Sequence, residues 1–313
     1  MSAADPRVSV IMAVYNEQAF VAEAIESVLA QDFGDHEVIV SDDGSTDATA
    51  EIADSFAARD PERIKVLRGE QNQGKPFALN RALAIARGEL IAWLDGDDVM
   101  LAGKLERQVA ALDADPAAAG CTHDAEIFDS DSGAAIGRFS QVMSGVPLRS
   151  GGIELWFDPT YRMLPSATMI RAALCPRGGF DERLTYTNDW LFDIEVFRRG
   201  RCVAIDDVLV RYRRHGDNFT TRADNSGVSY EEGMMTMALV TARYPELARR
   251  ARTMSTALML GQARRHAARR EWGAAAGYGR AARGMGGLTG MLEVGAAMAH
   301  SGLRRKRSRR ASS

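Results

Sequence analysis

The sequence has few cysteines and no long hydrophobic run, and both absences exclude classes of protein. Its three cysteines, Cys121, Cys175 and Cys202, lie far apart and form no Cys-x-x-Cys pair. This spacing argues against a disulfide framework or a zinc cluster and fits a reducing cytosol. No uninterrupted run of about 18 apolar residues exists, so no membrane span is expected. The N-terminus has no basic segment followed by a long apolar core, so no signal peptide is expected either.

Glycine is missing where two nucleotide-binding classes require it. In a dinucleotide-binding fold, glycines in the first strand–helix turn let the backbone approach a pyrophosphate. Here that turn, residues 14–18, reads Val-Tyr-Asn-Glu-Gln. No glycine-rich run ends in Lys-Ser or Lys-Thr, as a P-loop does. The sequence also lacks the glycine-rich, basic loop that a sugar-1-phosphate nucleotidyltransferase needs after its first strand. Any phosphate must therefore be held by other groups.

The overall composition is that of a folded protein, but its charge is divided along the chain. With 313 residues, 46% hydrophobic and 26% charged, the chain has room for one large domain plus an appendage, or for two domains. Residues 221–313 contain 17 basic and 6 acidic residues, a balance of +11. Residues 1–220 contain 22 basic and 36 acidic residues, a balance of −14. An acidic body followed by a basic extension indicates two separate roles.

The most informative stretch is Leu90 to Asp98, in which five apolar residues run directly into three carboxylates and a glycine. A continuous apolar run of this kind is typical of a strand buried on both faces, and ligands gather beyond the carboxyl ends of such strands. Asp95 and Asp97 are two positions apart and can point to the same side, while Gly96 lets a ligand approach the main chain. Hard oxygen ligands suit Mg²⁺ or Mn²⁺. The alternative is a helix N-terminus whose acids face the positive end of the helix dipole.

Strand and helix patterns alternate through the first third of the chain, which predicts βαβ units and a mainly parallel sheet. Strands are expected over 7–14, 36–40, 64–67 and 90–94, and helices over 17–31, 46–58, 76–87 and 101–112. A less regular part follows, with a hairpin turn at 131–133 between short strands, strands over 167–170 and 202–210, and a helix over 189–199. Beyond residue 220 we expect several helices and no strand, and the tail 304–310 is too charged to pack.

Several polar residues near these strand ends also have ordinary structural interpretations. Asn16 is expected to cap the first helix. Asp42 and Asp47 are expected to be turn and helix-cap residues rather than ligands. Asp98 is expected to form a local hydrogen bond, and Trp93 to belong to the core.

Six segments of the chain resemble the motifs of family 2 glycosyltransferases with the GT-A fold, in the same order. They are Val-Ser-Val-Ile-Met-Ala-Val-Tyr-Asn-Glu (8–17), Ser-Asp-Asp-Gly-Ser-Thr-Asp (41–47), Leu-Asp-Gly-Asp-Asp (94–98), Gly-Gly-Phe-Asp-Glu (178–182), Asn-Asp (188–189) and Tyr-Arg-Arg-His (212–215). The resemblance implies an α/β fold, with a mainly parallel but mixed central sheet flanked by helices, over residues 1–220. A helical C-terminal region (221–303) and a basic, disordered tail (304–313) then follow.

The resemblance also implies which residues bind a nucleotide-sugar donor. Asp43 matches the acid that hydrogen-bonds the base, and Ala13 and Tyr15 line the same pocket. Asn72 and Gly74 match a loop near the base and ribose. The donor-binding set is completed by Glu17, Lys75, Asp95, Gly96 and Asp97, with Lys75 reaching a phosphate. Leu79 stands where many family members have an arginine.

For the chemistry, the resemblance implies a divalent metal, Mn²⁺ or Mg²⁺, held by Asp95 and Asp97, with His215 completing the site as in some relatives. Asp97 is the expected direct ligand. Asp189 matches the base that activates the acceptor, and an N-cap is its structural alternative. A free Asp has a pKa of about 3.9, so we expect an apolar neighbour such as Trp190 to raise its basicity. Asn188 stands beside it where a glutamate is usual.

The expected function is therefore metal-assisted, inverting transfer of a sugar from a nucleotide-diphosphate sugar, a UDP-sugar first among these, to a saccharide or lipid-linked acceptor. Cell-envelope or extracellular polysaccharide assembly is the expected context. The alternative is a catalytically silent sugar-binding or scaffolding protein on the same fold. The helical extension either covers the sheet, mediates self-association, or joins the basic tail in binding an anionic membrane surface. Nucleic acid is not expected, because aromatic residues do not alternate with the basic ones. The expected location is cytoplasmic, with a peripheral position at the cytoplasmic face of the membrane as a variant.

Overall fold

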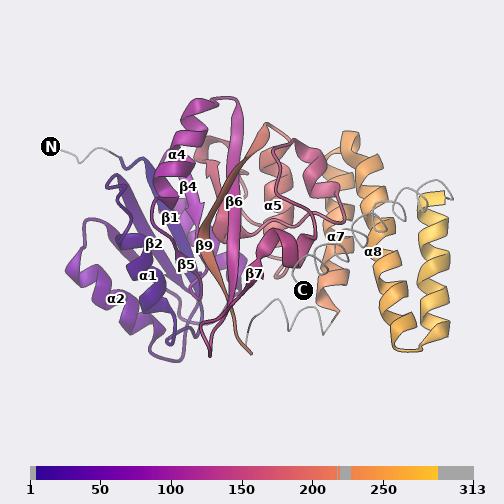
Figure 1. The fold of residues 1–313 in the computed structure, drawn as a ribbon, viewed down its shortest axis with the longest axis horizontal. Helices are drawn as coiled ribbons and strands as arrows, with labels where there is room; N and C mark the ends of the chain where they lie inside the picture. The colour runs from indigo at the N-terminus through magenta and orange to yellow at the C-terminus, as the bar shows by residue number, and fades with distance from the viewer. Residues whose placement is uncertain (1–4, 217, 219–226, 288–313) are drawn as a thin grey trace. The chain divides into compact units, whose positions relative to one another are not determined.

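The computed structural model describes residues 5–216, 218 and 227–287 (Figure 1). They form two compact units. The sheet unit comprises residues 5–142, 148–152 and 163–216. The helical unit comprises residues 143–147, 153–162, 218 and 227–287. Each unit is described here by itself. The expected division of the chain at residue 220 remains a prediction.

The sheet unit is built on one mixed sheet with strand order β3-β2-β1-β4-β8-β6-β9-β5, and β7 pairs with β6. The strands are β1 (Val8–Val14), β2 (His36–Asp42), β3 (Ile64–Arg68), β4 (Leu90–Trp93), β5 (Val99–Met100), β6 (Ala118–Asp129), β7 (Ala135–Arg138), β8 (Thr168–Arg171) and β9 (Arg201–Arg214). Pairs β2–β3, β1–β2 and β1–β4 are parallel, and β8 runs antiparallel to both β4 and β6. The predicted parallel first half is confirmed.

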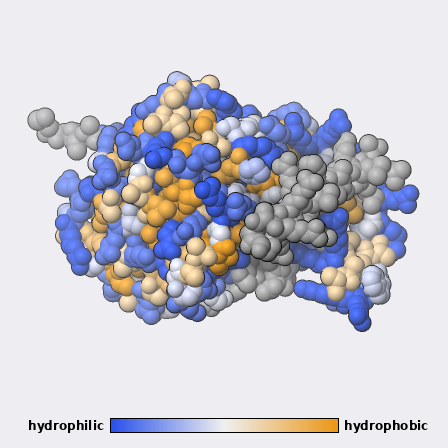
Figure 2. All heavy atoms as spheres, in the orientation of Figure 1, coloured by the Kyte–Doolittle hydropathy of each residue, from blue (hydrophilic) through white to orange (hydrophobic). Residues whose placement is uncertain are grey.

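The helices of the sheet unit are α1 (Val21–Leu29), α2 (Thr49–Arg59), α3 (Lys75–Ile85), α4 (Lys104–Ala114) and α5 (Asn188–Phe197). Short helical turns of the sheet unit are η3 (Pro165–Ala167) and η4 (Ala172–Leu174), while η1 (Ser140–Ser144) has residues in both units and η2 (Ile153–Phe157) belongs to the helical unit. Each of α1, α2 and α3 follows a parallel strand, as the βαβ pattern predicts. The core that they cover is apolar, and Figure 2 shows that hydrophilic residues occupy most of the face in view, with hydrophobic residues in smaller groups.

The first helix begins later than expected, and Asn16 is not its cap. Asn16 has a left-handed φ of 53°, and its Oδ1 accepts a hydrogen bond from the Thr46 N–H at 2.8 Å. The N–H of Glu17 donates to Thr49 Oγ1 at 2.7 Å, so the turn after β1 is tied to the loop after β2. Because these backbone groups bond to a neighbouring loop, α1 begins only at Val21.

The turn role expected for Asp42 is confirmed, whereas Asp47 is not the cap of α2, since Ala48 holds that position. Asp42 Oδ2 accepts from the N–H groups of Gly44 and Ser45 at 3.1 Å each, which closes the turn after β2. Asp47 Oδ1 accepts from the Thr49 N–H at 2.9 Å at the start of α2. Trp93 is 6% exposed and belongs to the core, where its ring meets those of Phe180 and Phe192 edge-on.

The main correction to the predicted fold is β6, a strand of 12 residues where short strands were expected. Its sequence, Ala-Ala-Gly-Cys-Thr-His-Asp-Ala-Glu-Ile-Phe-Asp, is rich in small and polar residues and has little intrinsic strand preference. It is held as a strand because β8 and β9 pair along it and most of its side chains are buried. The hairpin turn near Asp131 is confirmed, and it joins β6 to β7.

The described part of the chain beyond residue 220 is helical, as predicted. It contains α7 (Val228–Arg243), η5 (Pro245–Leu247), α8 (Ala248–Ala268) and a helix over 272–287. None of the described helices combines the length and the apolar character that crossing a membrane requires. The basic tail 304–313 lies outside the described residues.

Candidate active site

The candidate site forms at the edge of the sheet where parallel strands end. Because β1, β2 and β4 run parallel, the turns after them share one edge. The N–H of Asp43 donates to the Val14 carbonyl at 2.9 Å, and the N–H of Leu94 donates to the Ile11 carbonyl at 3.1 Å. These bonds join the loop after each strand to β1. The functional side chains are therefore fixed by the sheet itself.

Three carboxylates after β4 form what we call the acidic cluster, Asp95, Asp97 and Asp98. One carboxylate oxygen from each lies within 4.8 Å of the others. The Asp95 N–H donates to Ser166 Oγ at 3.1 Å, and the Asp98 N–H donates to the Asp95 carbonyl at 3.1 Å, so the segment is a tight turn. Such a set of hard oxygen ligands fits a divalent cation such as Mn²⁺ or Mg²⁺.

His215, just after the end of β9, reaches the acidic cluster. Its Nε2 lies 3.0 Å from Asp97 Oδ2. His215 directly follows β9, and its ring centroid is 4.9 Å from that of Phe20. The three predicted metal ligands, Asp95, Asp97 and His215, are thus gathered at one place from positions up to 120 residues apart.

Lys75, the first residue of α3, links the acidic cluster to Asp189. Its Nζ donates to Asp95 Oδ1 at 2.5 Å. Burial lowers the pKa of Lys75, but the negative charges of Asp95, Asp189 and Asp97 more than offset this, and the net pKa lies above its usual range. The ammonium group of Lys75 is therefore stabilised by these carboxylates, and it remains charged at neutral pH.

Asp189 lies in the first turn of α5, where burial raises its pKa to about 6. The positive charge of Lys75 and the Trp190 N–H, which donates to Asp189 Oδ1 at 2.7 Å, act in the opposite direction. Burial thus raises the pKa of Asp189 as expected, the backbone N–H of Trp190 lowers it, and the contribution of the Trp190 ring stays a prediction. The N-cap alternative for Asp189 is also wrong, because Thr187 holds that position.

Asp43 fixes the loop that precedes α3. It is 3% exposed, and its two carboxylate oxygens accept from the N–H groups of Gln73 at 3.0 Å and Gly74 at 2.7 Å. The predicted Asn72–Gly74 loop is thereby attached to the end of β2. Ala13 lies in β1 and is half-buried, and Tyr15, directly after β1, is 41% exposed. Asn72 is exposed.

The site roles of three residues, Asp98, Arg213 and Ser166, were not foreseen. Asp98 is fully buried, and its Oδ1 accepts from the Arg213 N–H at 3.1 Å, so the expectation of a local hydrogen bond is wrong. Arg213 also donates from Nε to the Asp97 carbonyl at 2.8 Å and pairs with Glu23. The signal for Arg213 was its place in the Tyr-Arg-Arg-His segment. Nothing local in the sequence singles out Ser166.

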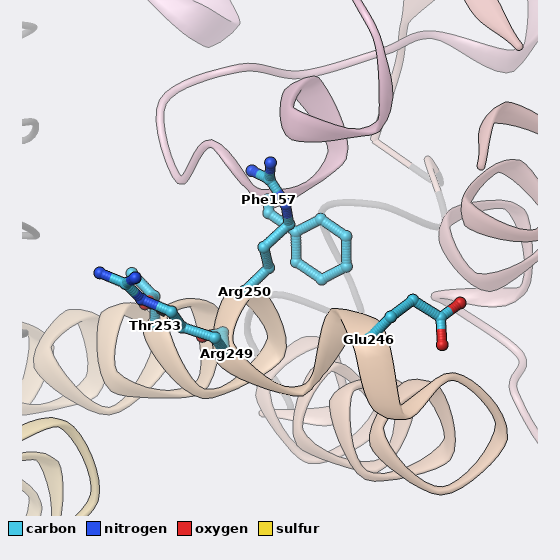
Figure 3. A pocket seen from close by; sticks show the side chains of 5 residues that line it. All are labelled: Phe157, Glu246, Arg249, Arg250 and Thr253. Carbon is cyan, nitrogen blue, oxygen red and sulfur yellow. Dashed lines mark hydrogen bonds between the residues drawn. The ribbon is translucent and has the colours of Figure 1, made fainter.

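A separate cavity of about 390 Å³ lies in the helical unit. Figure 3 shows its lining from η2, η5 and α8: Phe157, Glu246, Arg249, Arg250 and Thr253. Arg250 extends beside the Phe157 ring, while Glu246 points away from it (Figure 3). None of the predicted site residues lines this cavity.

The sequence profile of glycosyl transferase family 2 matches residues 9–171, which include all of β1 except Val8, together with β4 and the acidic cluster. The chain belongs to this family. It is 35% identical over 218 residues to an uncharacterised glycosyltransferase of Nostoc sp., and the match covers 68% of this chain and 66% of that protein. The matches cover about two thirds or less of the length of the first curated relatives.

Solved structures confirm the GT-A-type fold of this family 2 chain. TarS of S. aureus (residues 1–349), solved in complex with UDP-GlcNAc, has a TM-score of 0.63 at 21% identity, covering 81% of this chain and 72% of that one. The mannosyltransferase PcManGT of Pyrobaculum calidifontis, solved with GDP-Man and Mn²⁺, has a TM-score of 0.61 at 22% identity. That match covers 96% of this chain and 83% of PcManGT. At such identities the likeness concerns the fold.

Proposed function

We propose that this family 2 protein is an inverting glycosyltransferase that moves a sugar from a nucleotide-diphosphate sugar to a hydroxyl acceptor. The observation that carries the proposal is that Lys75 bonds to Asp95 of the acidic cluster and also feels the negative charge of the buried Asp189. A site for a negatively charged leaving group thus lies next to a carboxylate suited to take a proton. Transfer of a glycosyl group needs both functions together.

The residues present fit a divalent cation. Asp95, Asp97 and Asp98 offer carboxylate oxygens, and His215 offers a ring nitrogen beside Asp97. When bound, Mn²⁺ or Mg²⁺ would supply positive charge that stabilises the departing nucleoside diphosphate. Lys75 supplies a second positive charge from the protein itself. Arg213 holds this turn in place, because its Nε donates to the Asp97 carbonyl and its main-chain N–H donates to the Asp98 carboxylate.

Asp189 has the properties of the acceptor's base. A carboxylate with a pKa near 6 is ionised at neutral pH but accepts a proton more readily than a free Asp does. In the proposed step, the acceptor oxygen forms a bond to the anomeric carbon, the bond from that carbon to the diphosphate breaks, and the acceptor proton moves to Asp189. A single displacement of this kind inverts the anomeric configuration.

We propose a UDP-sugar as the donor and a saccharide or lipid-linked saccharide of the cell envelope or extracellular polysaccharide as the acceptor. The bound UDP-GlcNAc of TarS and GDP-Man of PcManGT support a nucleotide-sugar donor. Asp43 and the loop attached to it supply the proposed base pocket. Asn188 does not take the place of an acceptor-binding glutamate, since it is 4% exposed and its Nδ2 donates to the Thr185 carbonyl at 2.8 Å.

We also propose that the protein works in the cytoplasm, with its helical unit attached to an anionic membrane surface. Arg249, Arg250, Arg269 and Arg270 are exposed on and just after α8, and Trp272 is 66% exposed at the next helix. Exposed arginines with a neighbouring tryptophan favour the headgroup region of a bilayer. Co-sedimentation with vesicles containing phosphatidylglycerol tests this, and a variant with Arg269 and Arg270 changed to Glu is expected to remain in the supernatant.

The central experiment is hydrolysis and transfer with a panel of nucleotide sugars, with and without Mn²⁺. We expect one or two sugars to be turned over only when Mn²⁺ is present. Asp97→Ala should abolish turnover, and Asp189→Asn should lower kcat by about 10²-fold or more. Asp131→Ala, which removes an exposed carboxylate from the β6–β7 turn, is the matched control. A folded wild-type chain that binds sugars but turns none over would favour the catalytically silent alternative.

A further inference from the structure

A buried carboxylate oxygen beside the acidic cluster has no partner among the described residues. It is Oε2 of Glu17, in the turn after β1. The main chain of Glu17 is fixed, because its N–H donates to Thr49 Oγ1 and its carbonyl accepts from the N–H groups of Phe20 and Val21 at 2.9 Å each. A buried polar atom without a partner is costly, so its presence at a fixed position calls for a physical reason.

Gly96 shows where this carboxylate lies. A Cβ built on Gly96 would be 2.0 Å from Glu17 Oε2 and 2.7 Å from Val14 Cγ1. The Glu17 carboxylate therefore occupies the space that a side chain at position 96 would take, between Asp95 and Asp97 in the sequence. The glycine in the Asp-Gly-Asp segment is needed for Glu17 as much as for an incoming ligand.

The charges around Glu17 indicate that its carboxylate lacks a positively charged partner. Burial raises the pKa of Glu17 well above its usual value, and the negative charges of Asp97 and Asp95 raise it further, while Lys75 acts in the opposite direction. Four acids, Glu17 and the acidic cluster, thus lie in one region, in which Asp98 is buried and the other three are half-buried. Lys75 is already bonded to Asp95. A divalent cation would satisfy the remaining oxygens and offset this repulsion.

We propose that Glu17 is a further oxygen ligand of the cation at the acidic cluster, supplied by the β1 turn rather than by the Asp-x-Asp segment. The inference rests on the cation of the proposed function. If Glu17 is a ligand, the affinity for the cation depends on a residue outside the acidic cluster. Position 96 must then be glycine because any side chain there would collide with the Glu17 carboxylate. A purely structural Glu17 would instead be a protonated filler of the same space.

The test is Mn²⁺ binding to the full chain, measured by the electron paramagnetic resonance signal of free Mn²⁺. We expect Glu17→Gln to weaken Mn²⁺ binding at least tenfold and Glu17→Asp to weaken it less. Glu26→Gln is the matched control, since it removes an exposed carboxylate from α1 and should leave the Kd within twofold of wild type. A wild-type Kd in Glu17→Gln overturns the inference.

Melting temperatures separate a ligand from a structural residue. In EDTA, Glu17→Gln should melt at or above the wild-type temperature, because one of four crowded acids is gone, yet it should gain less from added Mn²⁺. A lower melting temperature in EDTA with an unchanged gain from Mn²⁺ would show a structural role instead. If the folded wild type binds no Mn²⁺, the metal dependence in the proposed function is wrong. If the wild type binds Mn²⁺ and the Glu17 variants bind it equally well, the proposed function stands but Glu17 is not a ligand.

Discussion

Lys104, in the first turn of α4, offers the sharpest test of the electrostatics inside the sheet unit. It is fully buried, and its Nζ donates to Gln108 Oε1 at 3.0 Å. Burial lowers its pKa from 10.5 to about 7, with only a small opposing effect from Cys121. The folded protein therefore releases a proton at pH values where the unfolded chain keeps it. We predict that Lys104→Met stabilises the protein near neutral pH.

The magnitude follows from the two pKa values. Between about pH 7 and 10.5 the unfolded state binds more protons at Lys104 than the folded state does, so the free energy of unfolding rises with pH. The cost of burying Lys104 is on the order of 4 kcal/mol at pH 7.5 and about 2 kcal/mol at pH 9. Methionine matches lysine in length, but Gln108 Oε1 loses its donor, which costs about 1–3 kcal/mol. The net gain should thus be about 1–3 kcal/mol at pH 7.5 and should vanish near pH 9.

Urea denaturation at pH values from 7.5 to 9, followed by far-ultraviolet circular dichroism, measures this difference. Burial raises the pKa of Cys121 and Cys175 to about 12 and raises that of Cys202 as well, so these thiols lower stability only as pH rises above about 9, outside the range of the test. The control is Arg107→Met, which removes an exposed positive charge from the same helix, where it pairs with Asp207. The reasoning is refuted if the wild type and Lys104→Met show parallel dependence on pH.

Three further predictions concern the site and its support. If Asp189 is the base, kcat/KM should fall tenfold per pH unit below about pH 6, because the protonated carboxyl group accepts no proton. A flat profile of kcat/KM down to pH 5 would exclude Asp189 as the base. Gly96→Ala should weaken Mn²⁺ binding as strongly as Glu17→Gln, because the new Cβ would displace the Glu17 carboxylate; equal binding to wild type would contradict that packing. Ser9→Ala should destabilise the protein by about 1–3 kcal/mol in urea titration, since Ser9 Oγ donates to Glu37 at 2.7 Å and accepts from the Gly88 N–H at 2.8 Å; no change in midpoint would show that the network contributes nothing.

The sequence alone determined the parallel half of the sheet and the grouping of acids at its edge. Continuous apolar runs such as Ile91 to Leu94 have one stable environment, a strand buried on both faces, and the turn that follows must then lie at the carboxyl edge. Asp43 and Asp95 could be placed at one edge because parallel strands end on the same side. This inference needs only local pattern and the geometry of βαβ units.

The tertiary structure alone decided the contacts between distant segments. β6 forms from residues with little preference for strands because its neighbours pair with it, and no local pattern carries that information. Asp98 bonds to Arg213 across 115 positions, and Glu17 lies over Gly96, because burial and hydrogen bonding are satisfied by whichever groups the packing brings close. The residue types set the chemistry that is available. The raised pKa of Asp189 arises only because folding buries its carboxyl group, and Lys75 meets Asp95 only because the fold brings α3 to the end of β4.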